Sequence, residues 1–230
     1  MSRTKTIALI TIGQTPRTDI VSDYTALWGN AFTIAEYGAL DGLTAEEICS
    51  LAPAPGEHDL ITRLQDGSSV LVSHDRLVPY MQQAVERAAA GGMDIGIIQC
   101  TGEFAGLTAA SPLVYPCDIL ENSVGSLISK GQSVIVLVPT PGQAPEATER
   151  WQRRGYQVAK TIVASPFAGG EELLKTIQGV EGLSAVAGII ADCYGFSNSF
   201  YDSVSEFYDK PVFIPRRLIA HLLSSVLAKA

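Results

Sequence analysis

The sequence predicts an α/β fold made of two related halves, each with a parallel sheet flanked by helices. Short apolar runs without alternation, such as Thr6–Ile12 and Ser133–Val138, are typical of strands that are buried on both faces. Longer stretches with helical spacing lie between these runs in regular order, which is the pattern of a doubly wound parallel sheet. Two strand ends also repeat each other in sequence, which indicates an internal duplication.

In the first half, four strands alternate with three helices. A helix begins after Thr44 because Thr-Ala-Glu-Glu places Glu47 where a capping box needs it, and Gly91-Gly92 ends a later helix. We expect strands at Thr6–Ile12, Phe32–Tyr37, Ser69–Ser73 and Ile95–Cys100, and helices at Thr18–Trp28, after Thr44 and at Arg76–Ala90.

In the second half the same alternation starts again. Pro139-Thr140-Pro141-Gly142 separates a strand from the next helix as a turn. We expect strands at Ser133–Val138, Gln157–Ala164, Ala187–Asp192 and Pro211–Ile214, and helices at Ile119–Ser129, Ala144–Arg154, Glu171–Gln178, Ser199–Tyr208 and Arg216–Ala228.

The internal repeat concerns two cysteines. Ile97–Phe104 and Ile190–Phe196 each read as a buried strand that delivers Cys-x-Gly to its carboxyl end. A weaker repeat pairs Leu9–Gln14 with Val136–Pro141. Because the two repeats occur in the same order, we place a boundary near residue 105, with domains at 1–104 and 105–216.

Composition limits the function classes. The 230 residues include 47% hydrophobic and 17% charged residues, and the net charge is −8, so neither nucleic acid nor an anionic membrane is an expected partner. The N-terminal apolar run is too short and wrongly flanked for a signal peptide or a spanning helix. We therefore expect a cytoplasmic protein.

Cysteine usage and motifs limit the cofactors. Four cysteines without tight spacing do not form a disulfide framework, and no Cys-x-x-Cys or Cys/His cluster suggests a metal. Neither the dinucleotide motif G-x-G-x-x-G nor the P-loop motif is present. We expect reduced thiols and no cofactor or metal. The sequence leaves the oligomeric state open, and a homo-oligomer is compatible with it.

Cys100 and Cys193 are the candidate catalytic residues. Ligands bind outside the carboxyl ends of the strands in open parallel sheets, and both thiols fall there. The glycine two residues after each cysteine would let a helix begin, and a helix N-terminus lowers a thiol pKa. Two such thiols facing across a cleft would act on opposite faces of one carbon, one removing a proton and the other returning one. The alternative is that both are small buried packing residues, as we expect for Cys49 and Cys117.

Loops at other strand ends supply candidate substrate-binding residues. Arg17 would offer a guanidinium to a carboxylate, or else be a solvated surface residue, while His74 would orient substrate or be structural. Glu103 and Asp192 flank the cysteines and are left out of the acid–base assignment, and Asp192 would point off the opposite side of its strand. The full set of candidate binding residues is Gly13, Gln14, Thr15, Arg17, Ser73, His74, Arg76, Thr101, Gly102, Tyr194 and Gly195.

These motifs resemble those of the AroM protein family along essentially the whole chain. The resemblance depends on Thr11–Arg17, Cys100-Thr101-Gly102 and Asp192–Phe196. Such proteins look like relatives of the aspartate/glutamate/hydantoin racemase superfamily, which includes maleate isomerase and arylmalonate decarboxylase. The resemblance implies two pseudo-symmetric flavodoxin-like domains, with the helix at 217–230 packing back on the first. It also implies a cofactor-free site in the cleft between the domains, with one cysteine from each.

The resemblance is incomplete at the residues after the cysteines. The racemases usually show Cys-Asn-Thr, Cys-Gly-Thr or Cys-Thr-His there, whereas this chain has Cys-Thr-Gly and Cys-Tyr-Gly. Thr101 and Tyr194 would lie near a substrate carboxylate. We expect a cofactor-independent isomerase, of racemase type, that acts on a small carboxylate by proton transfer between two thiols. A cysteine-nucleophile isomerase or decarboxylase of a small diacid and a non-catalytic carboxylate-binding protein remain alternatives.

Overall fold

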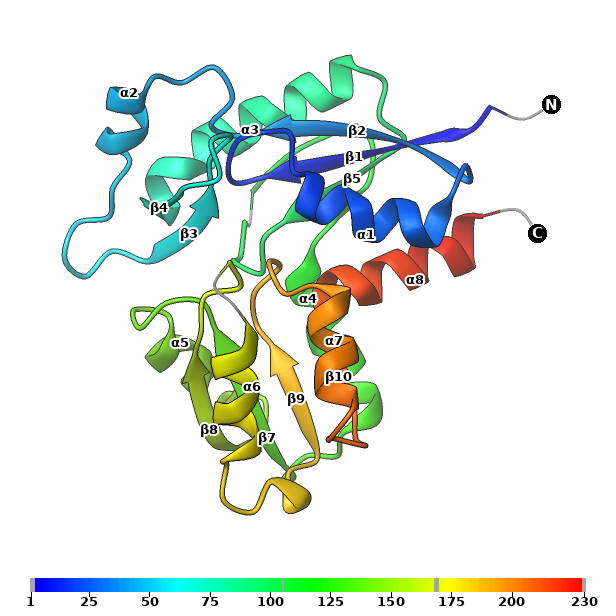
Figure 1. Ribbon diagram of the computed structural model, residues 1–230. Helices are drawn as coiled ribbons and strands as arrows, with labels where there is room; N and C mark the ends of the chain where they lie inside the picture. The colour runs from blue at the N-terminus through cyan, green and yellow to red at the C-terminus, as the bar shows by residue number, and fades with distance from the viewer. Residues whose placement is uncertain (1–2, 105, 168–169, 229–230) are drawn as a thin grey trace. The chain divides into compact units, whose positions relative to one another are not determined.

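The chain divides into two compact units, each of which has its own sheet. The computed structural model describes residues 3–104, 106–167 and 170–228 (Figure 1). The first unit comprises Met1–Pro116 with Ala220–Ala230, and the second comprises Cys117–Ile219. The domain limits that we expect from the sequence stay a prediction.

The sheet of the first unit is parallel, with the strand order β2-β1-β5-β6. β1 and β5 pair in register with Leu9 opposite Ile97 and Ile10 opposite Ile98. All four of these side chains are 1% exposed or less, because helices cover the sheet on both faces and leave no polar side to β1. The strands are β1 (Lys5–Thr11), β2 (Phe32–Gly38), β5 (Ile95–Gln99) and β6 (Leu113–Val114).

The helices of the first unit bury apolar stripes at helical spacing. α1 buries Ile20, Tyr24 and Trp28, and the Trp28 indole donates to the carbonyl oxygen of Ala220 at 2.9 Å. This hydrogen bond ties α1 to the last part of α8, drawn in red in Figure 1. The helices are α1 (Thr18–Trp28), α2 (Ala45–Ser50), α3 (His74–Ala90) and the end of α8 (Pro215–Leu227). The capping box of Thr44 and Glu47 at the start of α2 is confirmed.

An antiparallel hairpin departs from the all-parallel expectation. β3 (Asp59–Arg63) pairs with β4 (Ser69–Ser73), and only β4 was expected. β3 alternates in burial, with Leu60 and Thr62 buried and the residues between them less so. Its charged ends hide this short alternating pattern in the sequence, and the pairing with β4 stabilises it.

The second unit contains a parallel sheet with the order β10-β9-β7-β8. The central strand β7 is almost entirely buried, and Val136 lies opposite Ile190 of β9. The strands are β7 (Ser133–Val138), β8 (Gln157–Val163), β9 (Gly188–Ala191) and β10 (Val212–Phe213). The helices are α4 (Pro116–Leu127), α5 (Ala144–Arg153), α6 (Gly170–Gln178), the 3-10 turn Leu183–Ala185, α7 (Asn198–Ser205) and the start of α8.

The two sheets have one topology. If the strands of each sheet are numbered in chain order, both run second, first, third, fourth. β1, β2, β5 and β6 therefore correspond to β7, β8, β9 and β10. This correspondence confirms the fold class of two pseudo-symmetric, doubly wound α/β halves. It also makes β5 and β9, the strands before the two cysteines, equivalent elements.

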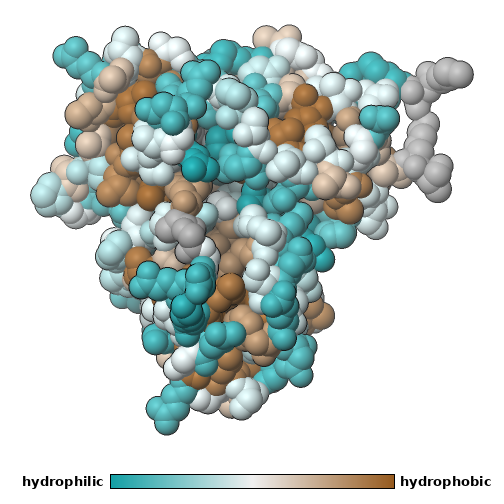
Figure 2. Space-filling model, viewed as in Figure 1, coloured by the Kyte–Doolittle hydropathy of each residue, from teal (hydrophilic) through white to brown (hydrophobic). Residues whose placement is uncertain are grey.

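The surface carries apolar residues in several separate groups. On the face drawn in Figure 2, these groups lie among hydrophilic residues. Leu127 and Val226, at 69% and 62% exposed, are the most exposed of the large apolar residues described. Of the helices in the described ranges, none is long and apolar enough to cross a membrane.

Candidate active site

Both cysteines lie just past the carboxyl end of the third strand of their sheet. Cys100 directly follows β5, and Cys193 lies two residues after the end of β9. The third strand is beside the first, where the strand order of a doubly wound sheet reverses. Ligands of such sheets bind outside the strand ends at this switch point. Each thiol therefore lies where ligands bind in doubly wound sheets.

The two sulfur atoms accept equivalent hydrogen bonds. The amide of Gly102 donates to the Cys100 Sγ at 3.3 Å, and the amide of Gly195 donates to the Cys193 Sγ at 3.5 Å. The donor is two residues after the acceptor in both cases. A backbone N–H directed at a sulfur favours the thiolate over the thiol, because the hydrogen bond is stronger to the charged form.

The expected helix N-termini at these thiols are wrong. After Gly102 the chain runs on to β6 without a described helix, and α7 begins only at Asn198, capped by the Ser197 side chain. The amide of the glycine in each turn donates to the sulfur, and no helix starts at that glycine. Cys-x-Gly permits both a turn and a helix start, and the sequence alone does not distinguish them.

The turn after Cys193 is packed more tightly than the turn after Cys100. A Cβ atom at Gly195 would lie 2.5 Å from Cγ of Pro166 and 2.8 Å from its Cβ, so no other residue fits there without movement. Cys100 is 7% exposed, and Cys193 is more open. Thr101 and Tyr194, the residues that follow the cysteines, are buried at 8% and 3% exposure.

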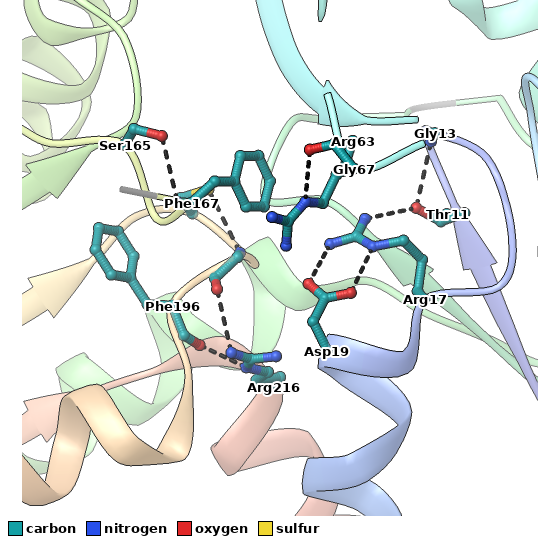
Figure 3. A network of polar contacts seen from close by, with 12 residues as sticks. Thr11, Gly13, Arg17, Asp19, Arg63, Gly67, Ser165, Phe167, Phe196 and Arg216 are labelled. Carbon is teal, nitrogen blue, oxygen red and sulfur yellow. Dashed lines mark hydrogen bonds and ion pairs between the residues drawn. The ribbon is translucent and has the colours of Figure 1, made fainter. Parts of the chain in front are cut away.

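Arg17 is buried, which excludes the solvated-surface alternative. Its guanidinium donates from Nε and Nη2 to the two carboxylate oxygens of Asp19 at 2.9 and 2.8 Å, and from Nη1 to Thr11 Oγ1 at 3.3 Å (Figure 3). A bidentate pair of this kind holds the fork in one orientation. Arg17 is thus a fixed cation beside the end of β1.

The neighbouring loop residues make contacts within the first unit. Gly13 is required by close approach, because a Cβ atom there would lie 2.4 Å from the carbonyl oxygen of Arg63. The side-chain amide of Gln14 accepts a hydrogen bond from the backbone N–H of Gln65 at 2.9 Å. It also donates one to the carbonyl oxygen of Leu40 at 3.3 Å. The Thr15 amide and hydroxyl both donate to Asp41. These contacts fix the loop.

The residues at the end of β4 have similar roles. The amide of buried Ser73 donates to the Leu51 carbonyl at 2.7 Å. Arg76 is half-exposed and pairs with Glu57 at 3.0 Å. The pKa of Glu57 is lowered by the hydrogen bond from the Ala54 amide and then by Arg76. His74 is held at both ring nitrogens, by Asp75 at 2.9 Å and by the Glu103 carbonyl at 2.8 Å.

Sequence reasoning missed two arginines near Cys193. Arg150 of α5 pairs with Asp192, which also accepts from the Trp151 indole at 3.0 Å, so Asp192 faces α5. Burial alone lowers the pKa of Arg150, but Asp192 outweighs it and the pKa is raised. Arg216, in the first turn of α8, donates to the carbonyls of Phe196 and Gly195 (Figure 3). A position directly after Pro215 was its only signal in the sequence.

The other two cysteines differ from each other. Cys117 is buried as expected, and burial, together with Asp118, raises the pKa of its thiol to about 11. Cys49 is exposed on α2, so the expectation that it packs on the apolar stripe is wrong; Ile48 is the buried residue. Within the described residues, no cluster of three or more histidine, cysteine or acidic side chains could hold a metal ion.

The fold is a two-half α/β architecture with a cysteine just past the third strand of each half. The model of the AroM protein family matches residues 7–227, and the chain belongs to that family. No curated protein matches the sequence.

Solved structures share the fold at low sequence identity. The maleate isomerase Iso from Pseudomonas putida S16 superposes with a TM-score of 0.64 at 11% identity, covering 97% of this chain and 92% of that one. Arylmalonate decarboxylase gives 0.63 at 15% identity, covering 98% and 95%. Aspartate racemase from Picrophilus torridus gives 0.57 at 13% identity, also covering 98% and 95%.

Proposed function

We propose that this protein is a cofactor-independent isomerase, of racemase type, that moves a proton at a carbon atom of a small carboxylate. The observation that carries the proposal is the matched pair of thiols. Cys100 and Cys193 each follow the third strand of their half, and each sulfur accepts an amide hydrogen bond from the glycine two residues on. The names of the solved structures with this fold, aspartate racemase, maleate isomerase and arylmalonate decarboxylase, support a small carboxylate as substrate.

The proposed step uses the two thiols in opposite protonation states. One cysteine, as thiolate, takes the proton from the carbon next to the carboxylate, and the electron pair left on carbon passes into the carboxylate as an enediolate. The other cysteine, as thiol, gives its proton to the opposite face of that carbon. Product release leaves the protonation states of the two thiols exchanged, and proton exchange with water restores them before the next turnover in the same direction, so there is no net consumption of acid, base or oxidant.

The enediolate needs positive charge or N–H donors, because the α-proton of a carboxylate is weakly acidic. We assign this role to the backbone amides of the two cysteine turns, with Thr101 and Tyr194 near the substrate carboxylate. Arg17 is the candidate cation, and its pairing with Asp19 reduces the charge that it offers to a substrate. Gly13, Gln14, Thr15, Ser73, His74 and Arg76 act by shaping the loops in this proposal.

Deuterium incorporation tests the proposal. The purified protein is incubated in D₂O with single enantiomers of aspartate, glutamate and 2-aryl carboxylic acids, and exchange and inversion are followed by NMR and chiral chromatography. We expect inversion with the wild type and none with Cys100→Ala or Cys193→Ala, while exchange from one face survives in one variant. Cys49→Ala is the matched control and keeps full activity. Full activity in both single variants would refute the mechanism.

A second candidate is nucleophilic attack by one cysteine on an unsaturated or aryl-substituted diacid. It is favoured by the similarity to a maleate cis–trans isomerase variant from Nocardia farcinica that carries a covalently bound succinylcysteine intermediate, with a TM-score of 0.61, 12% identity and coverage of 96% and 91%. Incubation with maleate followed by intact-mass and peptide analysis distinguishes the two. An adduct on one of the paired cysteines supports nucleophilic attack.

Thiol reactivity separates both enzymes from a protein that only binds carboxylates. If Cys100 and Cys193 react with iodoacetamide at pH 7 no faster than an ordinary thiol, a protein that only binds carboxylates is favoured.

Reduced thiols also require a reducing compartment, and the four cysteines are free, so we place the protein in the cytoplasm.

A further inference from the structure

The turn after Cys100 is anchored from outside by His74. The carbonyl of Glu103, three residues after the cysteine, accepts a hydrogen bond from His74 Nε2 at 2.8 Å. A carbonyl oxygen only accepts, so Nε2 carries the proton. The imidazole also contacts two aromatic rings, with centroids 5.4 Å from His58 and 4.9 Å from Phe104.

The turn after Cys193 is anchored at the equivalent atom by Arg216. The carbonyl of Phe196, again three residues after the cysteine, accepts from Arg216 Nε at 2.5 Å, and the carbonyl of Gly195 accepts from Nη2 at 3.1 Å. Arg216 is 2% exposed, so its hydrogen bonds are made with little competition from water. Figure 3 shows the guanidinium directed at the Phe196 carbonyl.

The two anchors come from unrelated places in the halves. His74 is the first residue of α3, which follows β4, whereas Arg216 lies in the first turn of α8, which follows β10. The sequence repeat around the cysteines does not include either of them. In both halves, nevertheless, a side chain donates a hydrogen bond to the carbonyl oxygen three residues after the cysteine. This position of the anchored carbonyl is the feature that the two turns share.

We propose that His74 and Arg216 are positioning residues, each of which sets the reactivity of the cysteine in its own half. This inference rests on the proposed function, which needs two reactive thiols. The N–H···S hydrogen bonds of 3.3 and 3.5 Å have ordinary lengths for a sulfur acceptor, but each requires the glycine N–H to point at the sulfur, so a rotation of the turn removes them. Fixing the carbonyl after the glycine prevents that rotation and keeps the glycine amide directed at the sulfur.

The experiment measures alkylation of each cysteine by iodoacetamide between pH 5 and 10, with peptide mass spectrometry to separate the sites. His74→Phe removes the donor and keeps an aromatic ring in contact with His58 and Phe104. We expect it to slow alkylation of Cys100 at pH 7 on the order of three- to tenfold and to move its pH profile upward, since one hydrogen bond to a charged group is lost. Alkylation of Cys193 stays unchanged.

Arg216→Met is the counterpart variant. We expect a slowing of roughly the same size for Cys193 and none for Cys100. His74→Gln restores a donor toward Glu103 and recovers most of the Cys100 rate, and Arg216→Lys recovers part of the Cys193 rate. These conservative variants also keep the test available if His74→Phe or Arg216→Met does not fold. The exposed thiol of Cys49 is the internal reference in every sample.

Each outcome decides the inference. Slowing confined to the thiol of the mutated half supports it, whereas equal effects on both thiols or no effect on either overturn it. If both wild-type thiols react like Cys49, the proposed function fails. The positioning role of His74 and Arg216 is then tested separately by hydrogen exchange of the Gly102 and Gly195 amides. His74→Phe must then accelerate exchange at Gly102 alone and Arg216→Met at Gly195 alone; any other pattern overturns the positioning role.

Discussion

Arg150 and Asp192 form an ion pair that joins α5 to the end of β9, one residue before Cys193. The side chain of Asp192 is 3% exposed and that of Arg150 is 16% exposed, so both charges are largely removed from water. The Trp151 indole gives the same carboxylate a further hydrogen bond. Because Cys193 packs among Phe196, Phe200 and their neighbours while Asp192 faces Trp151, the two residues point to opposite sides of the sheet. The carboxylate fixes the strand end and stays away from the thiol.

Removing Asp192 should destabilise the protein strongly. Asp192→Ala leaves the Arg150 guanidinium buried without its carboxylate, and breaking a buried pair in this way costs about 3–5 kcal/mol. Urea unfolding followed by circular dichroism measures the loss. Glu149→Ala is the matched control on the same helix, because its pair with Arg153 is exposed at 68% and 66% and should change stability by less than about 0.5 kcal/mol. Similar losses in the two variants would contradict the role of the buried pair.

The glycines of the two cysteine turns should respond differently to alanine. At Gly195 a Cβ atom would lie 2.5 Å from Pro166, whereas at Gly102 the nearest atoms, Cys100 Sγ and Leu60 Cδ2, are both 3.4 Å away. We expect Gly195→Ala to cost about 1–3 kcal/mol by overpacking and Gly102→Ala to cost less than about 1 kcal/mol. Thermal unfolding of both variants tests this order, and the reverse order would contradict it.

The equivalent strand-end positions of the two thiols were predictable from the sequence, and the contacts that His74 and Arg216 make with the turns after them were not. The repeat of Cys-x-Gly after a buried run indicated equivalent strand ends, which the shared strand order confirms. Strands β4 and β7 have the predicted limits because their apolar runs are local signals. β6 was missed because it has only two residues, which pair with Gly96 and Ile97 of β5.

Long-range contacts explain what the sequence did not show. Arg216 lies 20 residues from the carbonyl that it holds, and Arg150 lies 42 residues from Asp192. No spacing rule joins such residues, because the fold alone brings them together. The helix N-termini expected beside the two thiols failed because Cys-x-Gly fits both a turn and a helix start, and α7 begins only at Asn198.

Cys117 should be the least reactive thiol of the four at neutral pH. Burial and Asp118 raise its pKa to about 11, so at pH 8 only about one thiol in a thousand is ionised. Timed iodoacetamide labelling with peptide mass spectrometry should modify exposed Cys49 long before Cys117. Unfolding in urea is the control, because it exposes Cys117 and should bring its rate to that of Cys49. Rapid labelling of Cys117 in the folded protein would contradict its buried, neutral state.

Asp94 should make stability depend on acid pH. The pKa of its carboxyl is lowered from 3.8, chiefly because the Thr6 amide donates to it at 2.7 Å and also because of Arg3 and Lys5. A carboxyl whose pKa is lower in the folded state stabilises the protein above its ordinary pKa, and this contribution is lost as the pH falls through the folded value. Between pH 7 and pH 3 the wild type should therefore lose more stability than Asp94→Asn. Arg3→Ala separates the two causes, because it removes the nearby charge and keeps the Thr6 hydrogen bond. Most of the dependence of stability on acid pH should therefore remain in this variant. Equal pH dependence in the wild type and Asp94→Asn would contradict the assignment.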